Sequence, residues 1–96
     1  MPAFFIATSK IKNADKFADY GAKAGKTLAA HGGTLLIKGK AAETLAGQAD
    51  HQAVGVIRFA DMQALNAWYH SPEYQALIPL RDEAVEMTLT TYEAPA

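Results

Sequence analysis

The sequence predicts an α+β fold in which four strands and two helical regions follow in the order β-α-β-β-α-β. Three observations support this prediction. Four segments alternate their side chains with the period of a strand, two helical segments separate them, and a residue that caps helices begins each helical segment. This is the order of the ferredoxin-like split unit, in which the helices cover one face of a four-stranded antiparallel sheet.

The strands are short runs of apolar and β-branched residues. We expect them at residues 3–10, 34–39, 53–59 and 86–93. The first run is apolar on both faces, which is typical of a central strand that is covered on both sides. In the second run we expect Leu35 and Ile37 to face one way and Leu36 the other. The polar connection 40–52 is longer than a usual hairpin loop, so we expect it to be mobile or functional.

The first helix is predicted to begin after the capping residue Asn13 and to end at His31-Gly32-Gly33. Its inward stripe consists of Phe17, Gly21, Ala24 and Leu28. Gly21 and Gly25 each cost the helix about 1 kcal/mol relative to alanine. We interpret them as positions where the helix packs closely against the sheet.

The second helical region is predicted to begin at Asp61 and to contain two interruptions. Ser71 followed by Pro72 starts a new helix, because serine caps the free N–H groups and proline fits the first helical position. Pro79 lacks an N–H donor and disfavours a helical residue before it, so we expect a kink or break there. Short helical pieces meeting at an angle would form a rim for a cleft.

Composition and charge argue against several classes of partner and chemistry. A net charge of −1 among 96 residues and a pI near 6.3 argue against nucleic acid as a partner. No apolar run approaches the roughly 20 residues that span a membrane, and the start lacks the basic region of a signal peptide. The chain has no cysteine, which excludes disulfides and thiolate chemistry. We expect one domain over residues 1–96, cytoplasmic, with no nucleic acid or membrane partner.

The strands are apolar on the face that the helices do not cover. Exposing that face to water would leave an apolar patch larger than monomers usually carry. Two sheets packed face to face would bury it, so we expect a homodimer with twofold symmetry through the open sheet face.

The residues Tyr20, His31-Gly32-Gly33, the run 67–75 (Ala-Trp-Tyr-His-Ser-Pro-Glu-Tyr-Gln) and Arg81 resemble the bacterial domain of unknown function 1330 family, DUF1330. The likeness covers nearly the whole chain. It implies membership of the dimeric α/β-barrel superfamily, whose members include cofactor-free monooxygenases and isomerases as well as haem-using enzymes. The resemblance implies no particular reaction, because this family has none established. Where the family often has an arginine near the end of the second strand, this chain has Lys38, which lacks the planar fork of arginine.

Arg58 and Arg81 are the only arginines in the chain. Together they could bracket a carboxylate or enolate in a cleft, because the guanidinium fork matches planar oxyanions. The alternative is that each makes a structural ion pair, for which Asp82 and Glu83 lie close in sequence to Arg81.

Among the three histidines, His31 is the candidate general base, because an imidazole titrates near neutral pH. Its alternative role is structural, since the dipole at a helix C-terminus stabilises a cationic imidazole. His70 and Glu73 straddle a helix start without a third ligand nearby, so we expect no metal site.

Aromatic residues could form the wall of a pocket for a planar or acyl substrate. Tyr20, Trp68 and Tyr74 are the candidates, with core and dimer packing as the alternative role. Ser71 is a further candidate ligand contact, although its capping role is sufficient to explain it.

Two functional hypotheses follow. In the first, the protein binds or transforms a small anionic or planar organic molecule without a cofactor, in a cleft between sheet and helices. His31 and Arg81 would be catalytic, and Tyr20, Arg58, Trp68, Ser71 and Tyr74 would contact the ligand. In the second, the protein is a non-catalytic homodimeric structural or interaction module.

Overall fold

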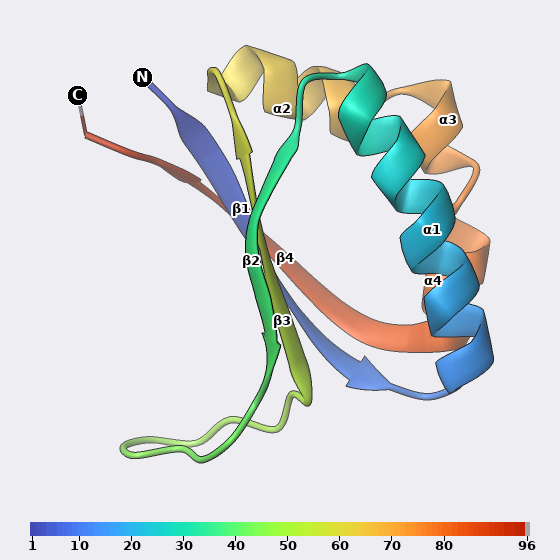
Figure 1. The fold of residues 1–96 in the computed structure, drawn as a ribbon, viewed down its shortest axis with the longest axis vertical. Helices are drawn as coiled ribbons and strands as arrows, with labels where there is room; N and C mark the ends of the chain where they lie inside the picture. Colours follow the sequence, from blue (N-terminus) through green and yellow to red (C-terminus); the bar gives the residue numbers. More distant parts are fainter. Residues whose placement is uncertain (96) are drawn as a thin grey trace.

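The protein folds as the predicted β-α-β-β-α-β unit (Figure 1). The computed structural model describes residues 1–95, so the predicted domain of residues 1–96 includes residue 96, which lies outside the described residues. The elements are β1 (Ala3–Ile11), α1 (Ala14–Ala30), β2 (Thr34–Lys40), β3 (Ala53–Phe59), α2 (Met62–Tyr69), α3 (Pro72–Gln75), α4 (Ile78–Ala84) and β4 (Val85–Glu93).

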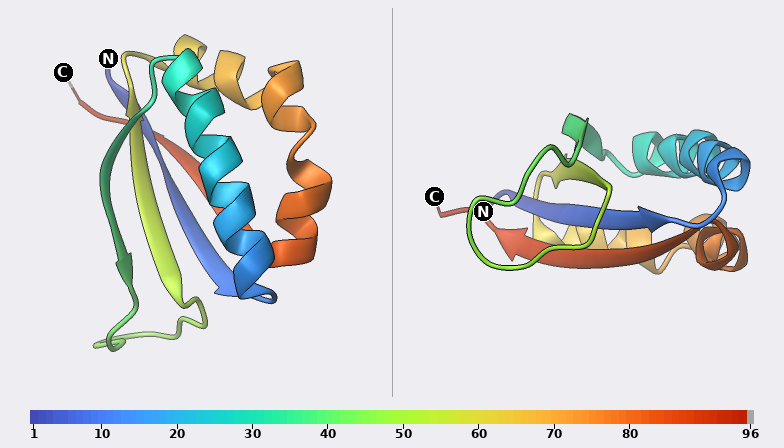
Figure 2. Two further views of the ribbon diagram at one scale, coloured as in Figure 1. Left: turned by 45° about the vertical axis from the view of Figure 1, so that its right-hand side comes forward. Right: turned by 90° about the horizontal axis from the view of Figure 1, so that it is seen from below.

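The strands form one antiparallel sheet in the order β2-β3-β1-β4. The helices lie on one side of this curved sheet and leave its other side uncovered (Figure 2). β1 is a central strand, as its two apolar faces predicted: it pairs with β3 along one edge and with β4 along the other. The arrangement confirms the ferredoxin-like α+β fold.

The register assigns each strand residue to a face. Phe5 of β1 lies opposite Ile57 of β3 and Thr91 of β4, and these residues share the face that the helices cover. Ile6 lies opposite Val56 and Thr90 on the uncovered face. Apolar side chains therefore occur on both faces of the sheet, as the strand pattern predicted.

The prediction that Leu35 and Ile37 share a face was wrong. A bulge in β2 places Leu35 opposite Ile57 and Ile37 opposite Val56, which lie on different faces of β3. An extra residue in one strand reverses the alternation beyond it. As a result Leu35 and Lys38, which pairs with Gly55, lie on the helix-covered face.

Three side chains cap the helices at the predicted positions. Asn13 accepts a hydrogen bond from Lys16 N at 3.0 Å, and Asp61 accepts one from Ala64 N at 2.8 Å. Ser71 accepts one from Tyr74 N at 3.2 Å. The predicted interruptions are also present, because α3 begins directly after Ser71 and α4 begins at Ile78.

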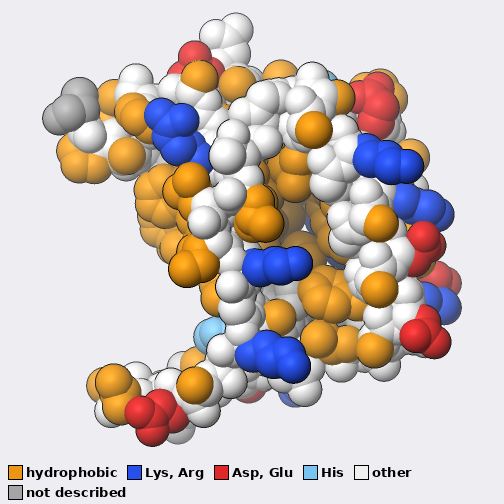
Figure 3. All heavy atoms as spheres, viewed as in Figure 1, with side chains coloured by type: hydrophobic (Ala, Val, Ile, Leu, Met, Phe, Trp, Pro, Cys, Tyr) orange, Lys and Arg blue, Asp and Glu red, His pale blue; other side chains and the backbone are white. Residues whose placement is uncertain are grey.

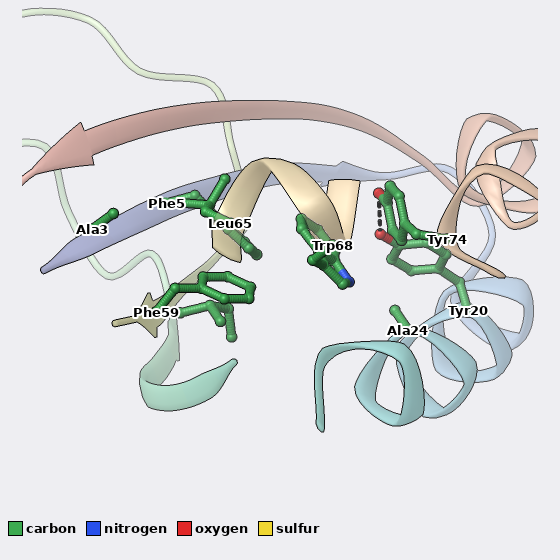
Figure 4. Packing of buried hydrophobic residues seen from close by; sticks show 9 residues of the cluster. Ala3, Phe5, Tyr20, Ala24, Phe59, Leu65, Trp68 and Tyr74 are labelled. Atoms are coloured by element: carbon green, nitrogen blue, oxygen red, sulfur yellow. Dashed lines mark hydrogen bonds between the residues drawn. The ribbon is translucent and has the colours of Figure 1, made fainter. Parts of the chain in front are cut away.

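Aromatic side chains dominate the core (Figure 4). Trp68 of α2 stacks on Phe5 of β1 with ring centroids 5.0 Å apart, and Phe59 lies 5.9 Å from Trp68. Tyr74 of α3 packs on the other side, 4.3 Å from Trp68. Trp68, Phe59 and Tyr74 are almost completely buried, so the stretch around Trp68 fixes α2 and α3 onto the sheet.

The connection 41–52 extends away from the sheet (Figure 1). Its two ends are joined by a hydrogen bond from Ala41 N to Gln52 O at 2.9 Å, and Leu45 within it is 88% exposed. A mobile or functional role for this loop stays a prediction. Within residues 1–95, no helix is both long enough and apolar enough to cross a membrane.

Candidate functional site

An open cavity of about 820 Å³ lies between α1 and the helix-covered face of the sheet. Figure 3 shows it as a hollow between α1 and β2 with hydrophobic side chains inside. Phe5 and Ala7 of β1, Ile57 of β3 and Leu89 of β4 are among the lining residues of the sheet, and Trp68 closes one end. Sites for small organic molecules typically enclose about 300–1,000 Å³ and are mostly apolar. The cavity has the size and the lining of such a site.

Glycines keep this cavity open. Gly21 and Gly25 of α1 and Gly55 of β3 all line it, and a Cβ atom at any of them would meet nothing within 4 Å. The expectation of close packing at Gly21 and Gly25 was therefore wrong. α1 lies against α4, and its Gly21 and Gly25 face open space toward the sheet.

Two lysines lie at the β2 side of the cavity. Lys38 and Lys40 line it, and Figure 3 shows lysine or arginine side chains beside the hollow there. The bulge in β2 turns both residues toward this face, since Lys38 pairs with Gly55 and Lys40 with Ala53. Among residues 1–95, neither lysine takes part in a salt bridge. They therefore supply positive charge that an anionic ligand group could approach.

The ring of Trp68 lines the cavity, and its N–H is hydrogen-bonded within the protein. The indole Nε1 donates to Thr27 Oγ1 at 3.0 Å, and that hydroxyl donates to the carbonyl oxygen of Ala24 at 2.7 Å. The first bond joins α2 to α1, and the second lies within α1 and orients the Thr27 hydroxyl. Trp68 is thus an apolar wall with a fixed orientation.

Tyr20, Tyr74 and Arg81 form a hydrogen-bonded chain across three helices. The hydroxyls of Tyr20 and Tyr74 lie 2.8 Å apart, as the dashed line in Figure 4 marks. Arg81 Nη1 donates to the hydroxyl of Tyr74 at 3.1 Å, and Arg81 Nε donates to Asp82 Oδ1 at 3.3 Å. Of these residues only Tyr20 lines the cavity.

Both ends of this chain have shifted pKa values. Burial raises the pKa of the Tyr20 phenol, and the neighbouring Tyr74 adds to the effect. Burial acts to lower the pKa of Arg81, but hydrogen bonds to Tyr69 and Tyr74 outweigh it and the pKa is raised. Tyr20 therefore stays neutral and Arg81 stays charged at any ordinary pH.

His31 lies at the C-terminal end of α1 and contacts protein groups. Its Nδ1 is 3.1 Å from the carbonyl oxygen of Thr27, and its Nε2 is 3.9 Å from Glu73 Oε2. It is not among the residues that line the cavity. Within residues 1–95, no three or more His, Asp or Glu side chains cluster in a way that could hold a metal ion.

The remaining predicted residues lie outside the cavity. Arg58 is exposed on the uncovered face of the sheet, opposite Phe4 and Thr34, whereas the cavity lies on the other face. Ser71 is buried, and its hydroxyl donates to the carbonyl oxygen of Trp68 at 2.7 Å while it caps α3. The structure thus brings Tyr20 and Trp68 to the cavity, connects Tyr74 and Arg81 to it through Tyr20, and places His31, Arg58 and Ser71 elsewhere. Their catalytic or ligand-binding roles stay predictions.

Sequence reasoning missed Lys38 and Lys40 as cavity residues. Their spacing of two predicts a shared face, but the bulge decided which face. It also missed Ser9, a buried polar residue on the cavity side of β1. A polar residue at a core position of an apolar strand was the available signal.

Comparison with solved structures shows the same fold in a cofactor-independent oxygenase and in proteins of unknown function. A protein of unknown function from Rhodopseudomonas palustris is 18% identical, with a TM-score of 0.85 over 99% of this chain and 83% of that one. SnoaB, a cofactor-independent oxygenase from Streptomyces nogalater, is 14% identical, with a TM-score of 0.73 over 99% and 94%. A dimeric ferredoxin-like protein of unknown function from Thermobifida fusca is 13% identical, with a TM-score of 0.64 over 98% and 92%.

Sequence comparison identifies the family. No curated protein matches the chain. One family model, described as a domain of unknown function (DUF1330), matches residues 2–95, which is nearly the whole sequence. The resemblance carried by Tyr20, the run 67–75 and Arg81 is therefore confirmed: the chain belongs to the DUF1330 family.

Proposed function

We propose that this protein binds a small planar organic anion, without a cofactor, in the cavity between α1 and the sheet. The observation that carries the proposal is the apolar cavity of about 820 Å³ with Lys38 and Lys40 on one side. An apolar body would replace water against Phe5 and Trp68, and its anionic group would lie near the lysines. SnoaB, which shares the fold, is a cofactor-independent oxygenase, so a site on this fold can work without a cofactor.

The open space is what separates a binding site from ordinary core packing. Protein interiors are packed nearly as densely as organic crystals, so a large empty space beside a helix forfeits contacts on every wall. Here three glycines maintain that space at a cost to helix and strand stability. A role in ligand binding accounts for this cost, whereas a purely structural module would gain from larger side chains there.

Binding of anthracene-2-sulfonate, a flat apolar molecule with one anionic group, tests the proposal. Trp68 is the only tryptophan and lines the cavity, so its fluorescence reports occupancy directly. We expect saturable quenching, weakened about fivefold when Lys38→Gln and Lys40→Gln are combined, since each exposed charge contributes under about 1 kcal/mol.

A matched control removes the same charge from α1 outside the cavity. Lys23→Gln combined with Lys26→Gln changes residues that do not line the cavity and should leave the affinity unchanged. Gly25→Leu, which fills open space, should abolish the quenching in a folded protein. An unaltered protein that shows no saturable binding of the probe would refute the proposal.

A second candidate role, a homodimeric interaction module, is favoured by the uncovered face of the sheet. Ile37 is 66% exposed there, and Tyr92 is 41% exposed and stacks on Phe4 with ring centroids 5.1 Å apart. We propose that a second copy of the chain covers this face, as the dimeric relative from Thermobifida fusca suggests. The two roles are compatible, because the cavity lies on the other face.

Sedimentation velocity tests the dimer. Ile6 lies in the middle of the uncovered face, so Ile6→Glu would bury a charge in the interface and should convert the dimer to a folded monomer. Leu45→Glu, at an exposed position of the loop 41–52, should leave the dimer intact. A monomeric unaltered protein at high micromolar concentration would contradict the proposed dimer.

A further inference from the structure

Tyr20 lines the cavity, and the partner of its hydroxyl hydrogen depends on the bonds that Tyr74 and Arg81 make. Arginine can only donate, so the hydroxyl oxygen of Tyr74 accepts the bond from Arg81 Nη1. Each tyrosine carries one hydroxyl hydrogen, and one of the two hydroxyls must donate to the other across their 2.8 Å separation. The tyrosine that accepts this bond keeps a hydrogen for another partner.

Burial decides which tyrosine keeps the free hydrogen. If Tyr20 donated, the hydrogen of Tyr74 would have no partner among the described residues, and Tyr74 is completely buried and away from the cavity. An unsatisfied buried donor costs about 1–3 kcal/mol. If Tyr74 donates, the free hydrogen belongs to Tyr20, which, unlike Tyr74, is a residue that lines the cavity. The second arrangement is therefore favoured.

The direction of this chain strengthens the donor at its end. Arg81 donates to Tyr74 and Tyr74 donates to Tyr20, so every bond is polarised in the same sense, away from a permanent positive charge. Hydrogen bonds that continue from a charged group are stronger than isolated neutral ones. The raised pKa of Tyr20 keeps its hydroxyl protonated and able to donate.

We propose that Tyr20 recognises an oxygen acceptor of the ligand, a carbonyl or enolate oxygen, by donating its hydroxyl hydrogen, with Tyr74 and Arg81 as positioning residues. This inference rests on the proposed function and deepens it. The ligand class becomes a planar molecule with two oxygen functions: an anionic group toward Lys38 and Lys40, and a carbonyl or enolate oxygen toward Tyr20. An aromatic anion without a carbonyl or enolate oxygen would contact only the lysines.

Two probes with the same three-ring skeleton separate the two claims. Anthracene-2-sulfonate and anthraquinone-2-sulfonate carry the same anionic group, but only the quinone has ring carbonyls that can accept a hydrogen bond. By isothermal titration calorimetry, we expect the unaltered protein to bind the quinone about tenfold more tightly. Tyr20→Phe should remove this preference while leaving the affinity for anthracene-2-sulfonate within about twofold.

Further variants test the role of the chain behind Tyr20. Tyr74→Phe removes the hydroxyl that orients Tyr20 without changing the shape of the core, and should reduce the preference for the quinone to about threefold. Tyr92→Phe, at an exposed tyrosine on the opposite face of the sheet, should keep the full preference. Circular dichroism confirms that each variant is folded before it is titrated.

The outcomes distinguish this inference from the proposed function. If both probes bind and Tyr20→Phe keeps the preference for the quinone, the donor role of Tyr20 is overturned and the cavity remains a binding site. Equal binding of the two probes to the unaltered protein overturns the donor role in the same way. If neither probe binds the unaltered protein, the proposed function and this inference fall together.

Discussion

The two ends of the helical layer meet the sheet in opposite ways. α2 and α3 press Trp68 and Tyr74 against Phe5 and Phe59, with rings 4.3–6.4 Å apart and almost no exposed surface. α1 turns small residues such as Gly25 toward the sheet and leaves an open cavity of about 820 Å³. The comparison teaches that a dense aromatic core at one end can hold a helix in place over a hollow at the other.

The contacts of α1 with the dense region explain how the hollow persists. Thr27 accepts the indole N–H of Trp68, and Tyr20 is bonded to Tyr74. These bonds fix two points of α1 to the well-packed helices, so α1 does not need to rest on the strands beneath it. The dense packing that stabilises the fold therefore surrounds Trp68, and the proposed binding site is the space beside it.

The largest expected loss of stability comes from truncating a side chain in the aromatic core around Trp68. Phe59→Ala removes a completely buried ring and should lower the free energy of unfolding by about 3–5 kcal/mol. Phe17→Ala, the same change at a half-buried position that lines the cavity, should cost roughly 1–2 kcal/mol because less contact is lost. Urea denaturation measures both, and equal losses would contradict the difference between the two regions.

Glycine substitutions should change stability in opposite directions at the two ends. A Cβ at Gly33 would lie 2.9 Å from the buried ring of Phe59, so Gly33→Ala should destabilise by about 1–3 kcal/mol. At Gly25 the new methyl group meets nothing, so Gly25→Ala should stabilise α1 by about 0.5–1 kcal/mol. Thermal denaturation should show a lower melting temperature for the first variant and a higher one for the second. A loss of stability in Gly25→Ala would mean that α1 packs closely on the sheet.

The last expected effect is a change in the pH dependence of stability, which is confined to alkaline pH. Because the pKa of Tyr20 is raised in the folded protein, its stabilising contribution is complete below the unfolded value of about 10 and is lost as the pH rises above it. Tyr20→Phe should therefore reduce the fall in unfolding free energy between about pH 10 and pH 12. Urea denaturation across this range measures it, with Tyr92→Phe as the control. The same fall in both variants would contradict a buried, protonated Tyr20.

Local signals explain why much of the fold could be predicted. Asn13, Asp61 and Ser71 cap their helices through contacts with residues three positions away, so the sequence around them is sufficient. The central place of β1 followed from its two apolar faces. The bulge at Leu36 could not be predicted, because it depends on how β2 pairs with β3.

The candidate site was less predictable for a physical reason. Glycines such as Gly21 and Gly25 occur both in helices that pack closely on a sheet and in helices that span a cavity. Only the surrounding structure distinguishes these two arrangements. Tyr20 and Trp68 were expected in a pocket wall and do line the cavity. Arg81 was expected either to hold a ligand or to pair with a nearby carboxylate such as Asp82, and its guanidinium does donate to Asp82. Its further bond to Tyr74 could not be predicted, because it depends on how α4 lies against α3.

A crystal structure of the protein with anthracene-2-sulfonate tests the central claim most directly. We predict density for the probe between α1 and the sheet, with its rings against Trp68 and beside Gly25 and its sulfonate toward Lys38. α1 should keep its distance from the strands, with the hydroxyls of Tyr20 and Tyr74 still bonded. A helix α1 collapsed onto the sheet, with no room for the probe between Gly25 and Gly55, would contradict the account.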